Sequence, residues 1–184
     1  MHPLFITLRA VVVASGFVWF WSYVALWTQR FDPLLGIALP AWTAPLGSVA
    51  IFCGAVLALT CVGLFVVRGR GTPAPFDPPR AFVAVGPYAK VRNPMYIGGW
   101  LALAGLGLWE RSAAMVLFSL LWVGAAHVLV VAYEERTLRK TFDGSYERYL
   151  QSVPRWMPTI RRSDQPMHFV STSMTDGSGA NRRS

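Results

Sequence analysis

The apolar residues of the chain fall into four long runs separated by polar connections. The runs cover about residues 4–27, 43–67, 95–109 and 113–133. About 20 apolar residues in a helix cross the roughly 30 Å hydrocarbon core of a bilayer, so three of the runs have the length of a span. The third run is shorter, which leaves open a helix that begins below the membrane surface or is re-entrant. The pattern predicts an all-α, polytopic bundle of about four transmembrane helices.

The first run has a secretory signal peptide as its rival interpretation. The run is longer than an ordinary signal-peptide core, and its end is rich in Trp and Tyr with no small-residue cleavage pattern. We therefore expect it to be retained as the first span.

The connection between the third and fourth runs is very short, Glu110-Arg111-Ser112, so these two helices should form an antiparallel hairpin. Gly98, Ala102 and Gly105 recur at helical spacing along the third run. A face of small residues lets helices approach closely in lipid, and we favour this packing role over a ligand-facing groove.

Residues 68–92 form the long polar connection. Its first part, GTPAPFDPPR at 71–80, holds four prolines and cannot be helical throughout, because proline removes a backbone donor and restricts its predecessor. A plain linker and a lid or cofactor wall are equally favoured interpretations of this extended segment.

The chain becomes highly charged after Tyr133. Residues 134–153 predict amphipathic surface helices, interrupted at Gly144, with Ser145 able to cap the second one. The second helix would place four residues on one apolar face: Tyr146, Tyr149, Leu150 and Val153. Residues 161–184 are polar and should be disordered. We expect residues 1–160 to form a single membrane-embedded domain.

Composition and charge agree with a membrane protein. The chain is 54% hydrophobic and 14% charged, whereas soluble domains carry about 25% charged residues. With four spans, 15 of the 17 Lys and Arg residues lie on one side, which leaves Arg30 and Arg111 opposite. The positive-inside rule then places both termini and the long connection in the cytoplasm. The net charge of +8 reflects this orientation and anionic lipid, and no nucleic-acid fold signature accompanies it.

The segment Gly86–Gly99, GPYAKVRNPMYIGG, combines a turn, cationic charge, tyrosine hydroxyls and the start of a helix. Asn93 is a favoured N-cap residue, and Pro94 suits the first helical turn. The N-terminus of a helix has unpaired N–H groups and partial positive charge, so it suits an anionic ligand group.

Two acidic residues follow the fourth run. We assign Glu135 to a solvated helix end, paired with Arg139 four residues later. Glu134 lies seven residues after His127, so the two would share a helix face. Such a face could be a pocket wall, although a lone membrane histidine is more often a hydrogen-bonded packing residue. Cys53 and Cys61 belong to no Cys/His cluster, which indicates buried, reduced thiols and no metal site.

Two blocks of the sequence resemble a known family. The first block is GPYxxVRNPMYxG. The second block, EExxLxxxFxxxYxxYxxxVPRWxP, begins at Glu134, about 38 residues after Tyr96 of the first block. This resembles the isoprenylcysteine carboxyl methyltransferase family, integral membrane enzymes related to phospholipid N-methyltransferases. The resemblance covers about residues 71–158. Asn93 stands where the family usually has histidine, and asparagine can exchange hydrogen bonds but cannot act as a base near neutral pH.

The resemblance implies that S-adenosyl-L-methionine binds in a cytoplasmic pocket without a Rossmann domain. The residues that it implies for cofactor binding are Arg80, Ala81, Phe82, Val83, Tyr88, Asn93, Pro94, Met95, Tyr96 and Glu134. The cofactor's carboxylate could bind the helix N-terminus or Arg92. Glu134 and Asn93 could accept hydrogen bonds from its ammonium and hydroxyl groups, and the tyrosines could stack on adenine or face the sulfonium.

The resemblance further implies methylation of a lipidic acceptor, and Arg92 and Glu134 are the expected catalytic residues. A carboxylate is already ionised at pH 7, so it needs only a cation to hold it, for which we choose Arg92. A phospholipid amine would need deprotonation, which would give Glu134 or Glu135 the role of base.

Two further functions compete with methyl transfer. The membrane sterol reductases, which bind NADPH, carry a similar sequence block, so a reductase related to them is one hypothesis. They usually have many more spans than this chain can form. A non-catalytic membrane scaffold is the other hypothesis.

The charge distribution makes a prediction about topology. A reporter fused after Ser184 and a second reporter inserted near Pro75 should both give a cytoplasmic signal. A periplasmic or lumenal signal from either position would rule out the arrangement with four spans and both ends inside.

Overall fold

The computed structural model describes residues 3–64, 67 and 84–158. The described residues fold as helices, and an isolated bridge pairs Ala38 with Ser112. The elements in chain order are α1 (Pro3–Thr28), the 3₁₀ turn η1 (Gln29–Phe31), α2 (Asp32–Leu35), α3 (Thr43–Leu64), the 3₁₀ turn η3 (Gly86–Ala89), α4 (Pro94–Trp109), α5 (Ala113–Leu129), the π-helical turn η4 (Val130–Glu134) and α6 (Glu135–Ser152).

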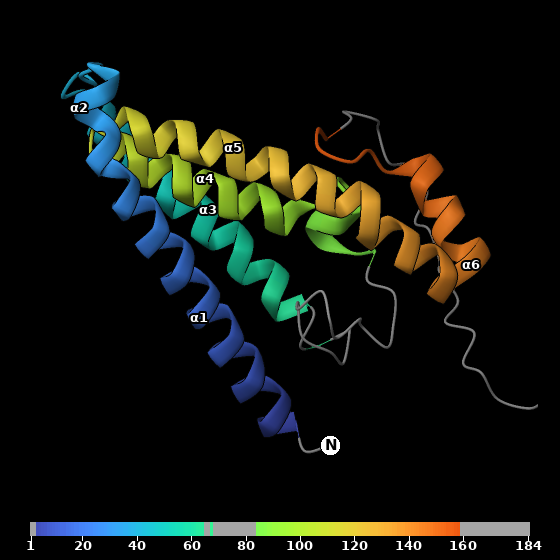
Figure 1. The fold of residues 1–184 in the computed structure, drawn as a ribbon. Helices are drawn as coiled ribbons and strands as arrows, with labels where there is room; N and C mark the ends of the chain where they lie inside the picture. Colours follow the sequence, from blue (N-terminus) through green and yellow to red (C-terminus); the bar gives the residue numbers. More distant parts are fainter. Residues whose placement is uncertain (1–2, 65–66, 68–83, 159–184) are drawn as a thin grey trace, which may run out of the picture.

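Helices α3, α4 and α5 run side by side, whereas α1 diverges from them toward its N-terminus (Figure 1). Helix α1 meets the bundle through Trp21, which lies edge-on to Trp122 of α5, with ring centroids 5.9 Å apart. Ala25, one turn further along, is fully buried. The last turns of α1 are therefore anchored to the bundle.

The predicted all-α bundle is confirmed, and the helices lie where the apolar runs placed them. Three stretches are long and apolar enough to cross a membrane within the described part of the chain: Val11–Leu35, Thr43–Leu64 and Ala113–Thr141. Helix α4 has only 16 residues, as the short third run indicated, but it lies along its longer neighbours (Figure 1). The chain therefore has the helices of a membrane protein.

Aromatic side chains mark the end of the bundle at which α2 lies (Figure 1). Trp27 lies near the end of α1, Trp42 precedes α3 and Trp109 ends α4, and all three are exposed. Asp32 ties this end together, since its carboxylate accepts a hydrogen bond from the backbone N–H of Ala114 at 2.8 Å. Exposed tryptophans at matching helix ends are typical of a membrane–water interface.

Glycines bring the backbones of α3 and α4 into contact. A Cβ atom at Gly54 of α3 would lie 2.5 Å from the carbonyl oxygen of Gly98 and 2.7 Å from the backbone nitrogen of Ala102. Gly47 stands in the same relation to Gly105, where the corresponding distance to the carbonyl oxygen is 2.5 Å. The small-residue face of α4 therefore packs against a helix, which confirms the packing interpretation over the ligand groove.

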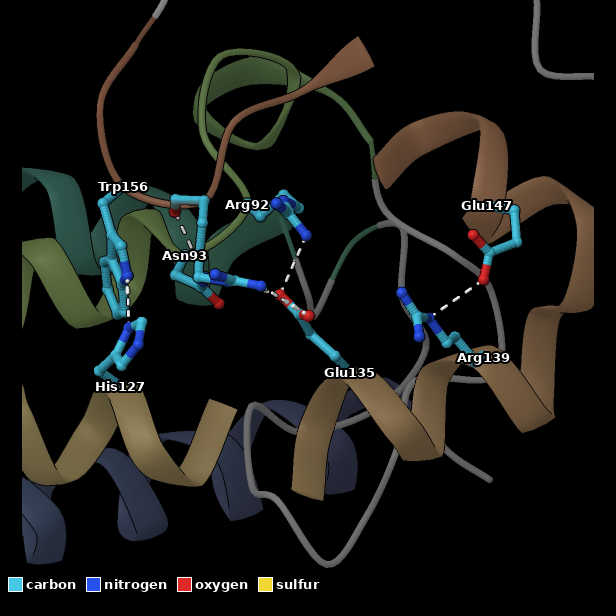
Figure 2. Close-up of polar contacts among 8 residues, drawn as sticks. Arg92, Asn93, His127, Glu135, Arg139, Glu147 and Trp156 are labelled. Atoms are coloured by element: carbon cyan, nitrogen blue, oxygen red, sulfur yellow. Dashed lines mark hydrogen bonds and ion pairs between the residues drawn. The ribbon is translucent and has the colours of Figure 1, made fainter. Parts of the chain in front are cut away.

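Helix α6 corrects one prediction about the charged region. We expected Gly144 to end one helix and Ser145 to begin another, but α6 continues through both positions. The expected interruption takes the form of a sharp reversal in direction (Figures 1 and 2). The reversal lets Arg139 pair with Glu147 at 3.0 Å, although a straight helix would separate them by about 12 Å along its axis.

The expected apolar face of α6 packs on protein. Tyr146, Tyr149 and Val153 form a buried cluster, against which Ala84, Leu138 and Leu150 pack. Both cysteines are free, as expected, but only Cys61 is buried, whereas Cys53 is exposed on α3. The proline-rich segment 71–80 and the tail 161–184 lie outside the described residues.

The α3–α4 contact predicts that Gly54→Ala destabilises the protein. The added methyl group would meet backbone atoms that cannot move aside, so the free energy of unfolding should fall by about 1–3 kcal/mol. Thermal melting in detergent measures the effect. Gly63→Ala on the same helix is the control, because no atom of the described residues beyond its own stretch of helix lies within 4 Å of its Cβ position. Equal melting of the two variants would contradict the prediction.

Candidate active site

The segment that precedes α4 lies folded against the bundle. Gly86 adopts a left-handed φ of 60°, which suits glycine, and starts the η3 turn. Tyr88 then packs in a cluster with Cys61 of α3 and Met95 of α4. Pro94 occupies the first turn of α4 as predicted, and it is buried. The segment therefore fixes the position of the α4 N-terminus.

Asn93 stands at the predicted N-cap position of α4, but its side chain makes no capping hydrogen bond. Instead, its Nδ2 atom donates to the carbonyl oxygen of Arg155 at 3.3 Å (Figure 2). The N-terminal N–H groups of α4 therefore have no side-chain cap from Asn93, which leaves the helix end suited to an anion.

The π-helical turn η4 separates α5 from α6 and ends at Glu134, the first residue of the acidic pair. A π turn contains one residue more than an α-helical turn and is frequent at functional sites. Glu134 ends the turn half-buried, and its Oε1 atom accepts a hydrogen bond from the hydroxyl group of Tyr96 on α4. This hydrogen bond links the end of the η4 turn to the first turn of α4.

His127 has a partner that the sequence did not indicate. Its Nδ1 atom accepts a hydrogen bond from the indole Nε1 of Trp156 at 2.9 Å, and the two rings lie against each other (Figure 2). This supports the hydrogen-bonded packing interpretation of His127. The extra residue of the π turn also changes the register between His127 and Glu134, so the seven-residue spacing does not place them on one α-helical face.

Glu135 corrects the prediction of a solvated helix end. It is buried, at 8% exposure, and its pairing with Arg139 is not formed, because Arg139 bonds Glu147 instead. Arg155 grips both oxygens of Glu135, with Nε 2.8 Å from Oε1 and Nη2 3.0 Å from Oε2. Arg92 adds a third bond, with Nη1 3.0 Å from Oε1 (Figure 2). The hydrogen bond with Glu135 raises the pKa of Arg155, so this guanidinium stays charged.

Residues 153–158 fold back over the segment that precedes α4. The backbone N–H of Arg92 donates to the carbonyl oxygen of Pro154 at 2.9 Å. The hydroxyl group of Tyr149 donates to the carbonyl oxygen of Tyr88 at 2.6 Å. Burial raises the pKa of Tyr149 and brings that of Tyr146 to about 12, so both hydroxyls stay neutral. The end of α6 and residues 153–158 therefore cover this segment.

Arg92 has one buried side-chain nitrogen without a partner among the described residues. Its side chain is 15% exposed, and its Nη1 atom binds Glu135. Among the described residues, Arg92 Nε and Trp100 Nε1 are the buried side-chain nitrogen atoms that have no hydrogen-bond acceptor. A buried N–H group of a guanidinium without an acceptor is costly, so this atom is suited to a ligand oxygen.

A comparison with known protein families identifies the family of the chain. The profile described as phospholipid methyltransferase matches residues 42–145, more than half of the chain. The chain belongs to the phospholipid methyltransferase family. No curated protein and no solved structure matches it significantly. The family indicates an enzyme that transfers methyl groups at a membrane, which implies a methyl donor.

The phospholipid methyltransferase match contains the residues that the structure gathers at the ends of α4 and α5. Arg92 bonds Glu135, Tyr96 bonds Glu134, and Asn93 bonds the carbonyl oxygen of Arg155, which itself holds Glu135. Tyr88 and Met95 contribute to the apolar cluster with Cys61 instead. The predicted cofactor residues Arg80, Ala81, Phe82 and Val83 lie outside the described residues.

The C-terminal residues that complete this cluster lie beyond the family match. Tyr149, Arg155 and Trp156 each bond a residue of the matched region. The sequence pattern placed Tyr149 on the apolar face of a helix, and it assigned Arg155 and Trp156 no role in the site. Pro154 and Pro158 were the available signal, because prolines after an amphipathic helix end the helix and favour a turn.

Proposed function

We propose that the protein uses S-adenosyl-L-methionine to methylate the carboxylate of a membrane-embedded lipidic acceptor, of the isoprenylcysteine type. The observation that carries this proposal is the state of Arg92. Its guanidinium is fixed by Glu135 through Nη1, while its buried Nε has no acceptor among the described residues. The Nε edge of arginine binds a carboxylate side-on with two parallel hydrogen bonds.

The described residues fit the cofactor. S-Adenosylmethionine supplies an electrophilic methyl group when bound. The uncapped N-terminus of α4 suits its carboxylate, and Glu134 is an acceptor for its ammonium or ribose hydroxyl groups. The Tyr96 ring lies beside Glu134 and suits a cation–π contact with the sulfonium. Arg80, Ala81, Phe82 and Val83 stay proposed as further cofactor residues on the resemblance alone.

In the proposed reaction, Arg92 binds the carboxylate of the acceptor and holds it in place. A carboxylic acid with an unperturbed pKa near 3.5 is ionised at pH 7 and needs no base. Arg92 would hold one or both of its oxygens, which leaves an oxygen lone pair as the nucleophile and places it beside the cofactor residues of α4. Holding two reactants in a fixed geometry can supply several kcal/mol of the barrier reduction.

Methylation of a phospholipid amine is the second candidate, and the position of Glu134 favours it. A half-buried carboxylate that accepts a hydrogen bond from Tyr96 could also take the proton that an ammonium must lose before methylation. The family match supports methyl transfer over a sterol-reductase-like activity or a scaffold. In either methylation reaction we place the protein as a multi-pass membrane enzyme with both termini and the site in the cytoplasm.

The cofactor proposal predicts that Glu134→Gln weakens S-adenosylhomocysteine binding at least about tenfold, because a charge-assisted hydrogen bond is worth roughly 1.5–3 kcal/mol. Calorimetry in detergent measures the affinity. Melting of the apo protein should change little, since glutamine can still accept from Tyr96. Glu147→Gln, at an exposed ion pair, is the control. If Glu134→Gln binds as tightly as wild type, Glu134 is only a structural partner of Tyr96.

The acceptor proposal predicts a strong effect of Arg92→Lys. Lysine keeps the charge but cannot reproduce the planar fork, so methyl transfer to prenylcysteine-like acids should fall strongly while cofactor affinity changes much less. The measurement pairs calorimetry with transfer of labelled methyl groups to a panel of these acids and phospholipid amines. Turnover of amines only, with Arg92→Lys active, would reject the carboxylate acceptor and retain methyl transfer.

A further inference from the structure

One carboxylate is shared by two arginines at the centre of the candidate site. Arg155 holds Glu135 by both oxygens, at 2.8 and 3.0 Å, and Arg92 binds one of the same oxygens at 3.0 Å. The side chains of Arg92 and Glu135 are 15% and 10% exposed, while that of Arg155 is 31% exposed. Glu135 is the most buried of the three and is therefore the fixed point of the group.

The geometry restricts what the Arg92 side chain can do. A bidentate contact with Arg155 leaves Glu135 little rotational freedom, because both oxygens are engaged in one plane. The Arg92 Nη1 atom is held to that fixed oxygen. Only the remaining edge of the guanidinium, which includes the unpartnered Nε, is then free to bind another group.

We propose that Glu135 is a positioning residue, which Arg155 holds in place and which aims the guanidinium of Arg92 at the acceptor carboxylate. The proposal rests on the proposed function, in which Arg92 holds the acceptor. Arg155 thereby makes the orientation of Arg92 depend on residues 153–158, which lie beyond the family match.

Removal of the Glu135 charge has a specific consequence. Arg92 and Arg155 would face each other without a carboxylate between them, and their repulsion would turn the Arg92 guanidinium away. The hydrogen bonds that the Pro154 and Arg155 carbonyl oxygens accept do not involve Glu135. Arg92 N–H still reaches the carbonyl oxygen of Pro154 at 2.9 Å, and Asn93 still reaches that of Arg155 at 3.3 Å. The fold should therefore keep both segments together while Arg92 loses its orientation.

The test compares Glu135→Gln, Arg155→Gln and their double variant in the full-length protein in detergent. Each variant is assayed for KM and kcat with a prenylcysteine acid and for S-adenosylhomocysteine affinity by calorimetry. We expect Glu135→Gln to raise KM for the acid at least about tenfold, the effect of losing a charge-assisted contact. The dissociation constant for S-adenosylhomocysteine should stay within about threefold of the wild-type value.

The remaining variants separate positioning from general stability. Arg155→Gln should raise KM in the same direction but less, because the Arg92–Glu135 pair remains. The double variant should be no worse than Glu135→Gln alone, since Arg155 acts through Glu135. Glu147→Gln breaks the exposed pair with Arg139 on the same helix and should leave KM unchanged.

Three results would overturn the proposal. The first is a wild-type KM in Glu135→Gln, and the second is a double variant whose two effects multiply. The third is a loss of cofactor affinity equal to the rise in KM. If Glu135→Gln does not fold, an unchanged KM in Arg155→Gln rejects the proposal instead. Failure of the proposed function is recognised separately, because the wild-type protein itself would then not methylate the acid.

Discussion

The close backbone contact between α3 and α4 is the constraint on which the other features depend. Gly54 and Gly98 face each other with no room for a side-chain carbon, so α4 has one position along α3. The N-terminus of α4 is thereby placed at the level of Tyr88 and Cys61. In lipid, where apolar side chains gain little from leaving the solvent, such close contact is a main source of helix association. The polar cluster is built on this rigid pair.

The polar cluster meets a different physical demand. Charged groups near a bilayer are costly unless they are paired, and pairs that lose one partner are costlier still. Two arginines around Glu135 satisfy the carboxylate and leave a net positive charge beside the uncapped end of α4. The site thus presents two positive features to a negative ligand, while Glu134 presents a negative one to a cation. Such separation of charge suits a zwitterionic cofactor.

The sequence was sufficient for the helices and for several site residues, and insufficient for their partners. Apolar runs and a proline at the first turn locate α1, α3, α4 and α5, because helix bounds in lipid follow local composition. The partner of Glu135 was mispredicted, because local spacing suggested Arg139, whereas Arg155 reaches Glu135 only after α6 reverses direction. The sequence VVAYE carries no local signal for a π turn, and its presence is known from the structure alone.

The π turn also has a consequence for how this sequence tolerates length changes. Each residue of an α-helix advances the direction of its side chain by about 100°. Deletion of one residue between Val130 and Tyr133 would turn the i→i+5 bonds of the π turn into the i→i+4 bonds of an α-helix, so the residues on either side would keep their faces. If the turn were rewound as α-helix with no residue removed, everything after it would instead rotate by about that angle relative to α5. Tyr96 would then no longer face Glu134. The π turn thus accommodates one extra residue between the apolar helix α5 and the polar helix α6, and it keeps Glu134 within reach of Tyr96.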